Sequence, residues 1–296
     1  MDFKQLKSFA AVVEYQNFSK AAERLNIAQP TISTHVRMLE EELNTRLILR
    51  TTKSLEITPQ GWDAYRYAVK ILDLKDRIMD SCSADSKNII RLGASTIPAA
   101  YILPEVLSRY GEVSPNSYFV INQARGQEVI EGVMDGQYDV GLTGAPTDRE
   151  GLVCLPLYEN RLVMITPVNE RFIRLQLQCA SSLEELLKEP MVLREVGSRK
   201  SANQYLEAMG ISEDKLHVVA RVNDQETVKN MVARGIGVSL ISEIAARDFV
   251  KERRLLKFTL PDYDSQQHIY LVYRNRFGSE SKVQDFVNFL QRYEVR

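Results

Sequence analysis

The chain has few of the residues that redox, metal or secreted proteins rely on. Its cysteines, Cys82, Cys154 and Cys179, are odd in number and far apart, a pattern that predicts neither a disulfide framework nor a zinc site. They are expected to be ordinary thiols, with redox sensing as the alternative. The three histidines are equally scattered. We therefore expect no metal site and no cofactor.

Long apolar runs are also missing. The opening residues MDFKQLKSF lack the apolar segment of a secretion signal, and no stretch approaches the roughly 20 apolar residues needed to cross a bilayer. These absences predict a cytoplasmic protein with no membrane partner. The formal net charge of -1 argues against a protein that coats nucleic acid nonspecifically, but a sequence-specific reader needs only a local basic patch.

Motifs of common enzymes are absent as well. There is no G-x-S-x-G elbow, no H-E-x-x-H and no phosphate loop ending in G-K-[ST]. The run Gly235-Ile236-Gly237-Val238 lacks the third glycine of a dinucleotide fingerprint, and a helix stop followed by a strand explains it better. We expect no enzyme. The 296 residues, 44% of them hydrophobic, exceed one compact core and predict at least two domains.

Two short helices joined by a tight turn are predicted between Ser19 and Arg50. Apolar residues recur at helical spacing in the second helix and must face a core: Ile32, Val36, Leu39 and Leu43. Short polar side chains and one fork-shaped cation occupy the opposite face, which suits base edges and phosphates: Pro30, Ser33, Thr34 and Arg37. Pro30 fits a first helical turn, and Asn44 tolerates the left-handed conformation of a helix stop.

The preceding segments complete a small helical core. We expect the first helix of the pair to begin with Ser19 as its N-cap. Its inward residues are small enough for close helix packing: Ala21, Ala22 and Leu25. An upstream helix is expected to add four apolar residues: Phe3, Leu6, Ala10 and Val13.

Residues Arg46 to Thr58 predict a two-stranded wing, because β-branched and apolar residues flank Thr52-Lys53-Ser54. Arg50 and Lys53 are then expected to reach neighbouring phosphates. The alternative is an ordinary helical domain, since any such domain can carry an amphipathic helix-turn-helix with exposed arginines. The wing that follows favours a DNA reader.

From Met1 to about Ser86 the chain resembles the winged helix-turn-helix and linker helix of LysR-type transcriptional regulators. The matching residues occur in family order and spacing: Phe9, Ser19, Ala21-Ala22, Leu25, Gln29-Pro30, Ser33, Arg37, Leu39-Glu40, Arg50 and Thr58-Pro59-Gln60-Gly61. In two places the chain departs from the family: Thr34 stands where a long basic side chain is common, and Ile48-Leu49 replace the usual Leu-Phe.

The resemblance implies a winged helix-turn-helix DNA-binding domain over residues 1–58, which reads an interrupted dyad in double-stranded promoter DNA. Eight residues are expected to contact DNA: Gln29, Pro30, Thr31, Ser33, Thr34, Arg37, Arg50 and Lys53. Within this set, we assign bases to Ser33, Thr34 and Arg37 and phosphates to the remaining hydroxyl and basic groups.

Residues 59–87 are predicted to form a linker helix and hinge. Thr58 and Pro59 make a helix start, and apolar residues recur at three- and four-residue spacing for several turns afterwards. Because so long an apolar face exceeds what a small domain covers, we expect a homodimer, and the resemblance adds a dimer of dimers, a homotetramer. The alternative is a helix docked on its own chain.

Short apolar strands alternate with helices from Asn88 onward, which is typical of an α/β fold. The cycle restarts after Pro167, and a last strand and helix are expected to return to the first half. This predicts an effector-binding domain over 88–296, with subdomain I at about 88–166 and 267–296 and subdomain II at about 167–266. The region resembles the periplasmic-binding-protein-like domain of the same family.

Ligands of open α/β sheets collect at the carboxyl ends of strands. Hydroxyl and amide donors follow the predicted strands of both halves and are expected to bind an effector: Ser95, Thr96, Thr143, Ser198 and Asn223. Because these strand ends are rich in donors and poor in carboxylates, we expect a small anion, a carboxylate or an inorganic oxyanion. The alternative is that they are helix caps. The run GASTIPAAYILP resembles a branch associated with sulfur or selenium metabolism.

Three classes of protein compete: a ligand-responsive transcription factor, a transport-type binding protein and an enzyme with an added DNA-binding domain. Only the first explains every segment, since the second should carry a signal sequence and the third a catalytic cluster. The sequence thus predicts a DNA-binding regulator, and the resemblance implies an activator with RNA polymerase as a further partner. Effector, target genes, sign of regulation and dimer or tetramer stay open.

Overall fold

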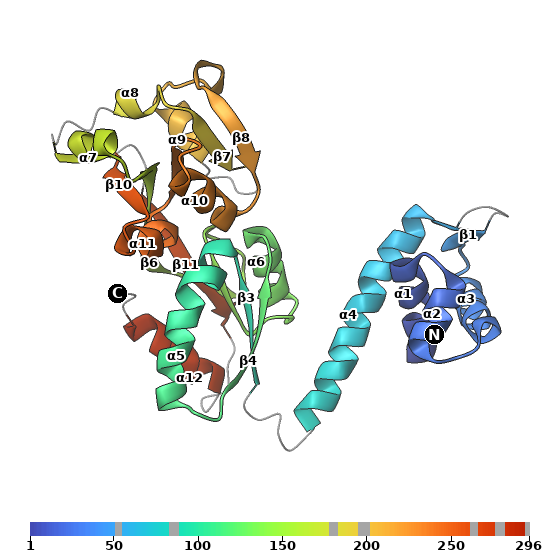
Figure 1. The fold of residues 1–296 in the computed structure, drawn as a ribbon. Helices are drawn as coiled ribbons and strands as arrows, with labels where there is room; N and C mark the ends of the chain where they lie inside the picture. Colours follow the sequence, from blue (N-terminus) through green and yellow to red (C-terminus); the bar gives the residue numbers. More distant parts are fainter. Residues whose placement is uncertain are drawn as a thin grey trace. The chain divides into compact units, whose positions relative to one another are not determined.

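The computed structural model describes residues 1–50, 55–82, 89–177, 183–194, 202–260, 266–275 and 282–293. The chain divides into two compact units, Met1–Lys87 and Asn88–Arg296 (Figure 1). Within the described ranges, no helix is both long enough and apolar enough to span a membrane.

The first unit is a three-helix bundle followed by a wing and a long helix. Its elements are α1 (Phe3–Tyr15), α2 (Phe18–Leu25), α3 (Gln29–Glu42), β1 (Ile48–Arg50), β2 (Leu55–Ile57) and α4 (Pro59–Cys82). The two short strands pair antiparallel, with Ile48 opposite Ile57. The predicted winged helix-turn-helix with its linker helix is therefore confirmed.

Three details of that prediction were wrong. Asn17, not Ser19, caps α2, because the Asn17 side chain accepts hydrogen bonds from the backbone N–H groups of Ser19 and Lys20. Phe3 lies half-exposed at the start of α1, and Leu43 is exposed because α3 ends one residue before it. The buried stripe of α3 is thus shorter than its sequence period suggests.

The core of the first unit forms where α1 crosses α2, α3 and α4. Its fully buried members are Phe9, Val12, Ala21, Ile32, Val36, Leu39 and Leu47. The left-handed conformation of Asn44 ends the α3 segment, as predicted. Glu40 on α3 is buried as well, and its carboxylate accepts hydrogen bonds from the backbone N–H groups of Leu47 and Ile48 at 2.9 and 3.0 Å. This contact fixes the wing to α3.

The long helix α4 begins as the sequence predicts. The Thr58 hydroxyl accepts a hydrogen bond from the Gly61 backbone N–H, which caps the first turn. One side of α4 packs on the bundle through Ala68 and its partly buried neighbours. Several large apolar side chains on α4 remain exposed: Trp62, Tyr67, Val69, Leu74, Ile78 and Met79.

The second unit alternates strands and helices. Its elements are β3 (Ile89–Ala94), the π-helical turn η2 (Pro98–Ile102), α5 (Leu103–Val113), β4 (Tyr118–Gln123), α6 (Gly126–Met134), β5 (Val140–Thr143), β6 (Leu152–Pro167), α7 (Glu170–Leu177), α8 (Leu183–Leu186), β7 (Met191–Arg194), α9 (Ala202–Ala208), the 3₁₀ turn η3 (Glu213–Lys215), β8 (Val218–Val222), α10 (Gln225–Ala233), β9 (Ser239–Ser242), α11 (Glu243–Lys251), β10 (Leu255–Thr259), β11 (Gln266–Arg274) and α12 (Lys282–Arg292).

Strand β6 is common to both halves of this unit. Its residues from Leu152 to Arg161 pair with β11, and its residues from Leu162 to Pro167 pair with β9 and β10. The first half is built on β3, β4, β5 and β11, with β4, β3 and β5 parallel. The second half contains β7 to β10 with α7 to α11. Strand β6 therefore connects the two halves, because it runs through both of them.

The C-terminal segment belongs to the first half. Strand β11 pairs antiparallel with β5, and α12 contributes Phe286 and Val287 to the core that also contains Ile90 and Leu92. Helix α12 lies against α5 of the first half (Figure 1). The second half has cores of its own, on either side of β6, β9 and β10. The predicted α/β domain of two subdomains is confirmed.

Candidate DNA interface and effector site

Helix α3 has two faces of opposite character. Ile32, Val36 and Leu39 have no exposed surface, because they pack into the core of the first unit. Gln29, Pro30, Thr31, Thr34 and Arg37 are exposed, and Ser33 is partly exposed. The predicted DNA-contacting residues of this helix therefore lie on its solvent side.

Their local contacts leave donors and acceptors available. The Gln29 side-chain amide donates to the Ser33 hydroxyl at 3.0 Å, while the Thr34 hydroxyl donates to the Pro30 carbonyl at 2.9 Å. Thr34 is exposed, and its hydroxyl oxygen keeps lone pairs that can accept a hydrogen bond. Arg37 pairs with Glu41 at 2.6 Å, and both side chains are more than half exposed. An exposed pair of this kind contributes little stability, so the guanidinium can exchange Glu41 for a nucleic-acid acceptor.

The remaining DNA residues belong to the wing. Arg50 ends β1, where its backbone pairs with Leu55. The Arg50 side chain lies outside the described residues, as does Lys53. The structure thus describes the two strands of the wing, and its two phosphate contacts stay predictions.

Three predicted effector residues lie at neighbouring strand ends in the first half. The Ser95 backbone N–H donates to the Leu142 carbonyl at 2.8 Å, which brings the ends of β3 and β5 together. Thr143 at the end of β5 is fully buried, and its hydroxyl accepts a hydrogen bond from the Ala145 N–H at 3.2 Å. Ser95 and Thr96 are partly exposed and are better placed to meet a ligand.

The corresponding strand ends of the second half are β7 and β8. These strands are parallel, with Arg194 in register with Val222, so exposed Asn223 follows directly beside Arg194. Arg194 donates from Nη2 to the Thr96 hydroxyl of the first half at 3.5 Å. Ser198 lies outside the described residues. Arg194 thus connects the two groups of strand ends that the sequence predicts to converge.

Sequence reasoning missed Arg194. Its Nε is buried and has no hydrogen-bond acceptor among the described residues. A buried guanidinium N–H without an acceptor is costly, and a carboxylate or oxyanion would satisfy it. The only sequence signal is an arginine at the last position of an apolar strand, directly before a polar loop, and such a residue is ordinarily expected to face solvent.

Asp224 adds a charge beside this arginine. The Thr227 hydroxyl and backbone N–H donate to the Asp224 carboxylate at 2.7 Å, and these hydrogen bonds lower the pKa of Asp224, with a smaller contribution from Arg194. Asp224 is the N-cap of α10. Its carboxylate therefore accepts hydrogen bonds from the start of α10 and also interacts with the Arg194 cation.

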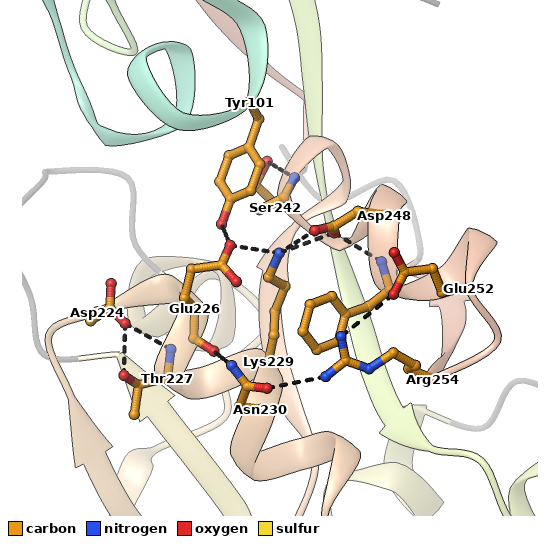
Figure 2. A network of polar contacts seen from close by, with 12 residues as sticks. Tyr101, Asp224, Glu226, Thr227, Lys229, Asn230, Ser242, Asp248, Glu252 and Arg254 are labelled. Atoms are coloured by element: carbon orange, nitrogen blue, oxygen red, sulfur yellow. Dashed lines mark hydrogen bonds and ion pairs between the residues drawn. The ribbon is translucent and has the colours of Figure 1, made fainter. Parts of the chain in front are cut away.

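A second contact joins the halves one helical turn further on. Tyr101, from η2, donates its hydroxyl to Glu226 of α10 at 2.5 Å (Figure 2). Burial, followed by this hydrogen bond, raises the pKa of Tyr101, so the phenol remains protonated and acts as a donor. Both of these contacts thus place a first-half hydroxyl against a charged second-half side chain.

Other features of the described residues do not compete with this site. Within these ranges, no three His, Cys, Asp or Glu side chains come close enough to hold a metal ion. Two hollows of the second half lie elsewhere. One is lined by residues between Glu213 and Arg221, and the other includes Pro167, Phe172, Pro190 and Val238 in its lining. Neither includes a predicted effector residue.

A winged helix-turn-helix joined to a two-half α/β domain defines a class, the ligand-responsive transcriptional regulators. Two family models match the chain: "Bacterial regulatory helix-turn-helix protein, lysR family" over residues 3–62 and "LysR substrate binding domain" over residues 83–294. The protein belongs to the LysR family of transcriptional regulators.

Similar proteins match this chain along nearly its whole length. An uncharacterized HTH-type transcriptional regulator of Methanocaldococcus jannaschii is 32% identical over 292 residues, which is 97% of each chain. The HTH-type transcriptional regulator CysL of Bacillus subtilis is 27% identical over 98% of this chain and 97% of its own. The solved structure of full-length CbnR in complex with its target DNA matches with a TM-score of 0.78 and 21% identity over 99% of each chain. At that identity the likeness concerns the fold.

Proposed function

We propose that this LysR-type regulator reads an interrupted dyad in promoter DNA through α3 and the wing. The observation that carries the proposal is the division of α3 into a fully buried apolar face and an exposed face with Arg37 at its centre. Ser33, Thr34 and Arg37 read bases in the major groove, while Thr31, Arg50 and Lys53 contact phosphates. Gln29 and Pro30 lie at the end of α3 that enters the groove.

A footprint on the DNA upstream of the protein's own gene tests this reading. The wild type should protect an interrupted dyad, and the Ser33→Ala, Arg37→Ala double variant should lose that protection. Lys7→Ala on α1 is a matched control, because Lys7 is an exposed cation outside the proposed interface. Equal loss of protection in the control, or no protection by the wild type at any salt concentration, contradicts the proposal.

The single substitutions separate base contacts from phosphate contacts. Arg37→Ala should cost roughly 1–3 kcal/mol at the specific site if the guanidinium meets a guanine. Lys53→Ala should weaken binding to all sequences alike and lower the salt slope by about one ion. Titrations of specific and random DNA at several salt concentrations distinguish the two outcomes, and an exchange of the two behaviours would contradict the assignments.

Self-association follows from α4. Its exposed apolar residues, among them Leu74, Ile78 and Met79, present a face that a second copy of the chain would cover. We propose a homodimer, assembling further into a tetramer on DNA, that acts in the cytoplasm and activates transcription with RNA polymerase as its partner. Sedimentation of the Ile78→Glu variant should show monomers, whereas an unchanged dimer contradicts this role of α4.

The effector is proposed to be a small anion held between the two halves. Arg194 supports this assignment, since its buried Nε has no acceptor among the described residues and its Nη2 already points at Thr96. Ser95, Thr96, Thr143, Ser198 and Asn223 would supply uncharged donors around it. An anion bound there would favour one arrangement of the halves and thereby change the DNA bend.

Calorimetry with a panel of anions tests the class of effector. Sulfate, selenite, phosphate and citrate cover inorganic oxyanions and carboxylates, and the resemblance of GASTIPAAYILP to a sulfur or selenium branch places the first two at the top of the list. Binding by at least one anion is expected. Binding of cations or neutral sugars alone would refute the proposal.

A further inference from the structure

Lys229 is an unusual residue for the middle of a surface helix, because its side chain has no exposed surface. Two carboxylates neutralise its ammonium group. Nζ lies 2.7 Å from Glu226, one turn earlier on α10, and 3.0 and 2.9 Å from the two oxygens of Asp248 on α11 (Figure 2). The carboxylates themselves are about half exposed, at 50% and 47%. Water therefore reaches the two carboxylates, whereas the ammonium group between them is buried.

Two aromatic rings help to shield the ammonium group of Lys229 from water. The Nζ of Lys229 lies 4.7 Å from the ring centre of Tyr101 and 4.5 Å from that of Phe249. A cation against the face of an aromatic ring is stabilised electrostatically, and more strongly when it is desolvated. Phe249 belongs to the second half, as Lys229 does, but Tyr101 comes from the first half. Part of the cover over Lys229 consequently comes from the other half.

The same tyrosine is held by a second contact. Its hydroxyl donates to the Glu226 oxygen that also pairs with Lys229 (Figure 2). One carboxylate oxygen thus receives a phenol and an ammonium group at once. If Lys229 were absent, Glu226 would lose the cation that holds it in place for Tyr101.

These contacts lie next to the proposed effector site on both sides. Tyr101 follows Thr96 through a short hydrogen-bonded helical segment, in which the Ala99 N–H donates to the Ser95 carbonyl at 2.9 Å. Glu226 lies in the first turn of α10, three residues after Asn223 and two after the capping Asp224. A change in the distance between Tyr101 and Glu226 would therefore move the strand ends that carry Thr96 and Asn223.

We infer that Lys229 is a positioning residue for the effector site, acting through a clasp formed by Tyr101, Glu226, Lys229 and Asp248. The clasp holds the segment that carries Thr96 at a set distance from Arg194. The positioning role of Lys229 rests on the proposed function. The contacts themselves join the halves with or without a ligand.

Hydrogen–deuterium exchange of the full-length protein, without DNA or effector, tests the clasp. Because a hydrogen bond to a charged acceptor changes an opening equilibrium by roughly tenfold or more, Tyr101→Phe should raise exchange about tenfold both in Pro98–Ile102 and in α10. A rise in one of these segments alone would mean that Tyr101 serves only its own half and would overturn the inference. A uniform rise across the second unit would overturn it too.

Tyr293→Phe is the matched control. Tyr293 also donates its hydroxyl to a glutamate, Glu105 at 2.8 Å, but both residues belong to the first half. This control should leave exchange in α10 unchanged, and an effect equal to that of Tyr101→Phe would refute a clasp between the halves. Lys229→Met should reproduce the Tyr101→Phe pattern, whereas unchanged exchange in Pro98–Ile102 would show that Lys229 does not position Tyr101.

The exchange experiment tests the contact between the halves independently of the proposed function. Failure of the exchange experiment would remove the clasp and leave the footprint and the anion binding standing. Failure of those two would remove the function and leave the contact between the halves intact.

Discussion

Replacing Glu40 tests how the wing is held to the recognition helix. Its carboxylate is only 7% exposed, and one oxygen accepts hydrogen bonds from the backbone N–H groups of Leu47 and Ile48. The other oxygen pairs with Arg46 at 2.9 Å, whose own side chain is 74% exposed. Alanine at this position leaves two buried N–H groups without an acceptor, which costs about 1–3 kcal/mol for each group. We expect Glu40→Ala to lower the free energy of unfolding of the first unit by roughly 4 kcal/mol.

Glu40→Gln separates the backbone contacts from the ion pair. The glutamine side-chain oxygen can accept both N–H groups, and exposed Arg46 can turn to water. The expected loss is therefore about 1 kcal/mol, typical of a mainly exposed ion pair. If the two variants lose the same stability, the ion pair and not the pair of backbone hydrogen bonds secures the wing, and the reasoning is wrong.

The single tryptophan makes the assay specific to this unit. Trp62 lies in the first turn of α4, so its fluorescence during urea unfolding reports on the first unit. With a denaturant slope of about 1.5 kcal/mol per molar, a 4 kcal/mol loss lowers the urea midpoint by roughly 2–3 M. The Glu40→Gln midpoint should fall by less than about 1 M.

Three further substitutions test other parts of the molecule. Gly61→Ala should destabilise the first unit by more than about 2 kcal/mol in the same urea assay, because a Cβ would lie 2.2 Å from the Leu47 carbonyl oxygen; an unaffected midpoint would contradict this close approach. Asp224→Ala should cost about 1 kcal/mol at neutral pH. The hydrogen bonds from Thr227 lower the native pKa of Asp224. Its contribution to the free energy of unfolding is therefore present above the ordinary carboxylate range and lost as the pH falls through the native pKa. Thermal unfolding should show a difference between variant and wild type that shrinks in acid, and a constant difference would contradict this. Arg194→Gln should weaken calorimetric binding of any stabilising anion about tenfold or more, and retained affinity would exclude Arg194 from the site.

Local patterns predicted most of the fold. The spacing of Ile32, Val36 and Leu39 identifies a helix with one buried face, and Asn44 marks where the chain turns away from it. These signals suffice because a helix period and a left-handed residue depend on near neighbours alone. They were weakest at element ends, where Phe3 and Leu43 have the right spacing but no core to cover them.

The candidate site could be predicted only in part. Ser95 and Thr96 could be proposed from the sequence because donors at strand ends are a local feature of an α/β sequence. Arg194 and Lys229 were missed, since a charged residue in an amphipathic pattern is expected to face solvent.

The sequence by itself thus determined the class of fold. It was also enough to propose a DNA-reading helix and the strand ends for a ligand, because these proposals depend on periodicity and capping within single elements. Only the tertiary structure decided which distant side chains meet. Arg194 reaches Thr96, and Tyr101 reaches Glu226 and covers Lys229, because β6 runs through both halves and brings their strand ends together. The sequence pattern around a residue carries no information on a partner roughly a hundred positions away. The burial of Lys229 against a residue of the other half is therefore seen only in the packed structure.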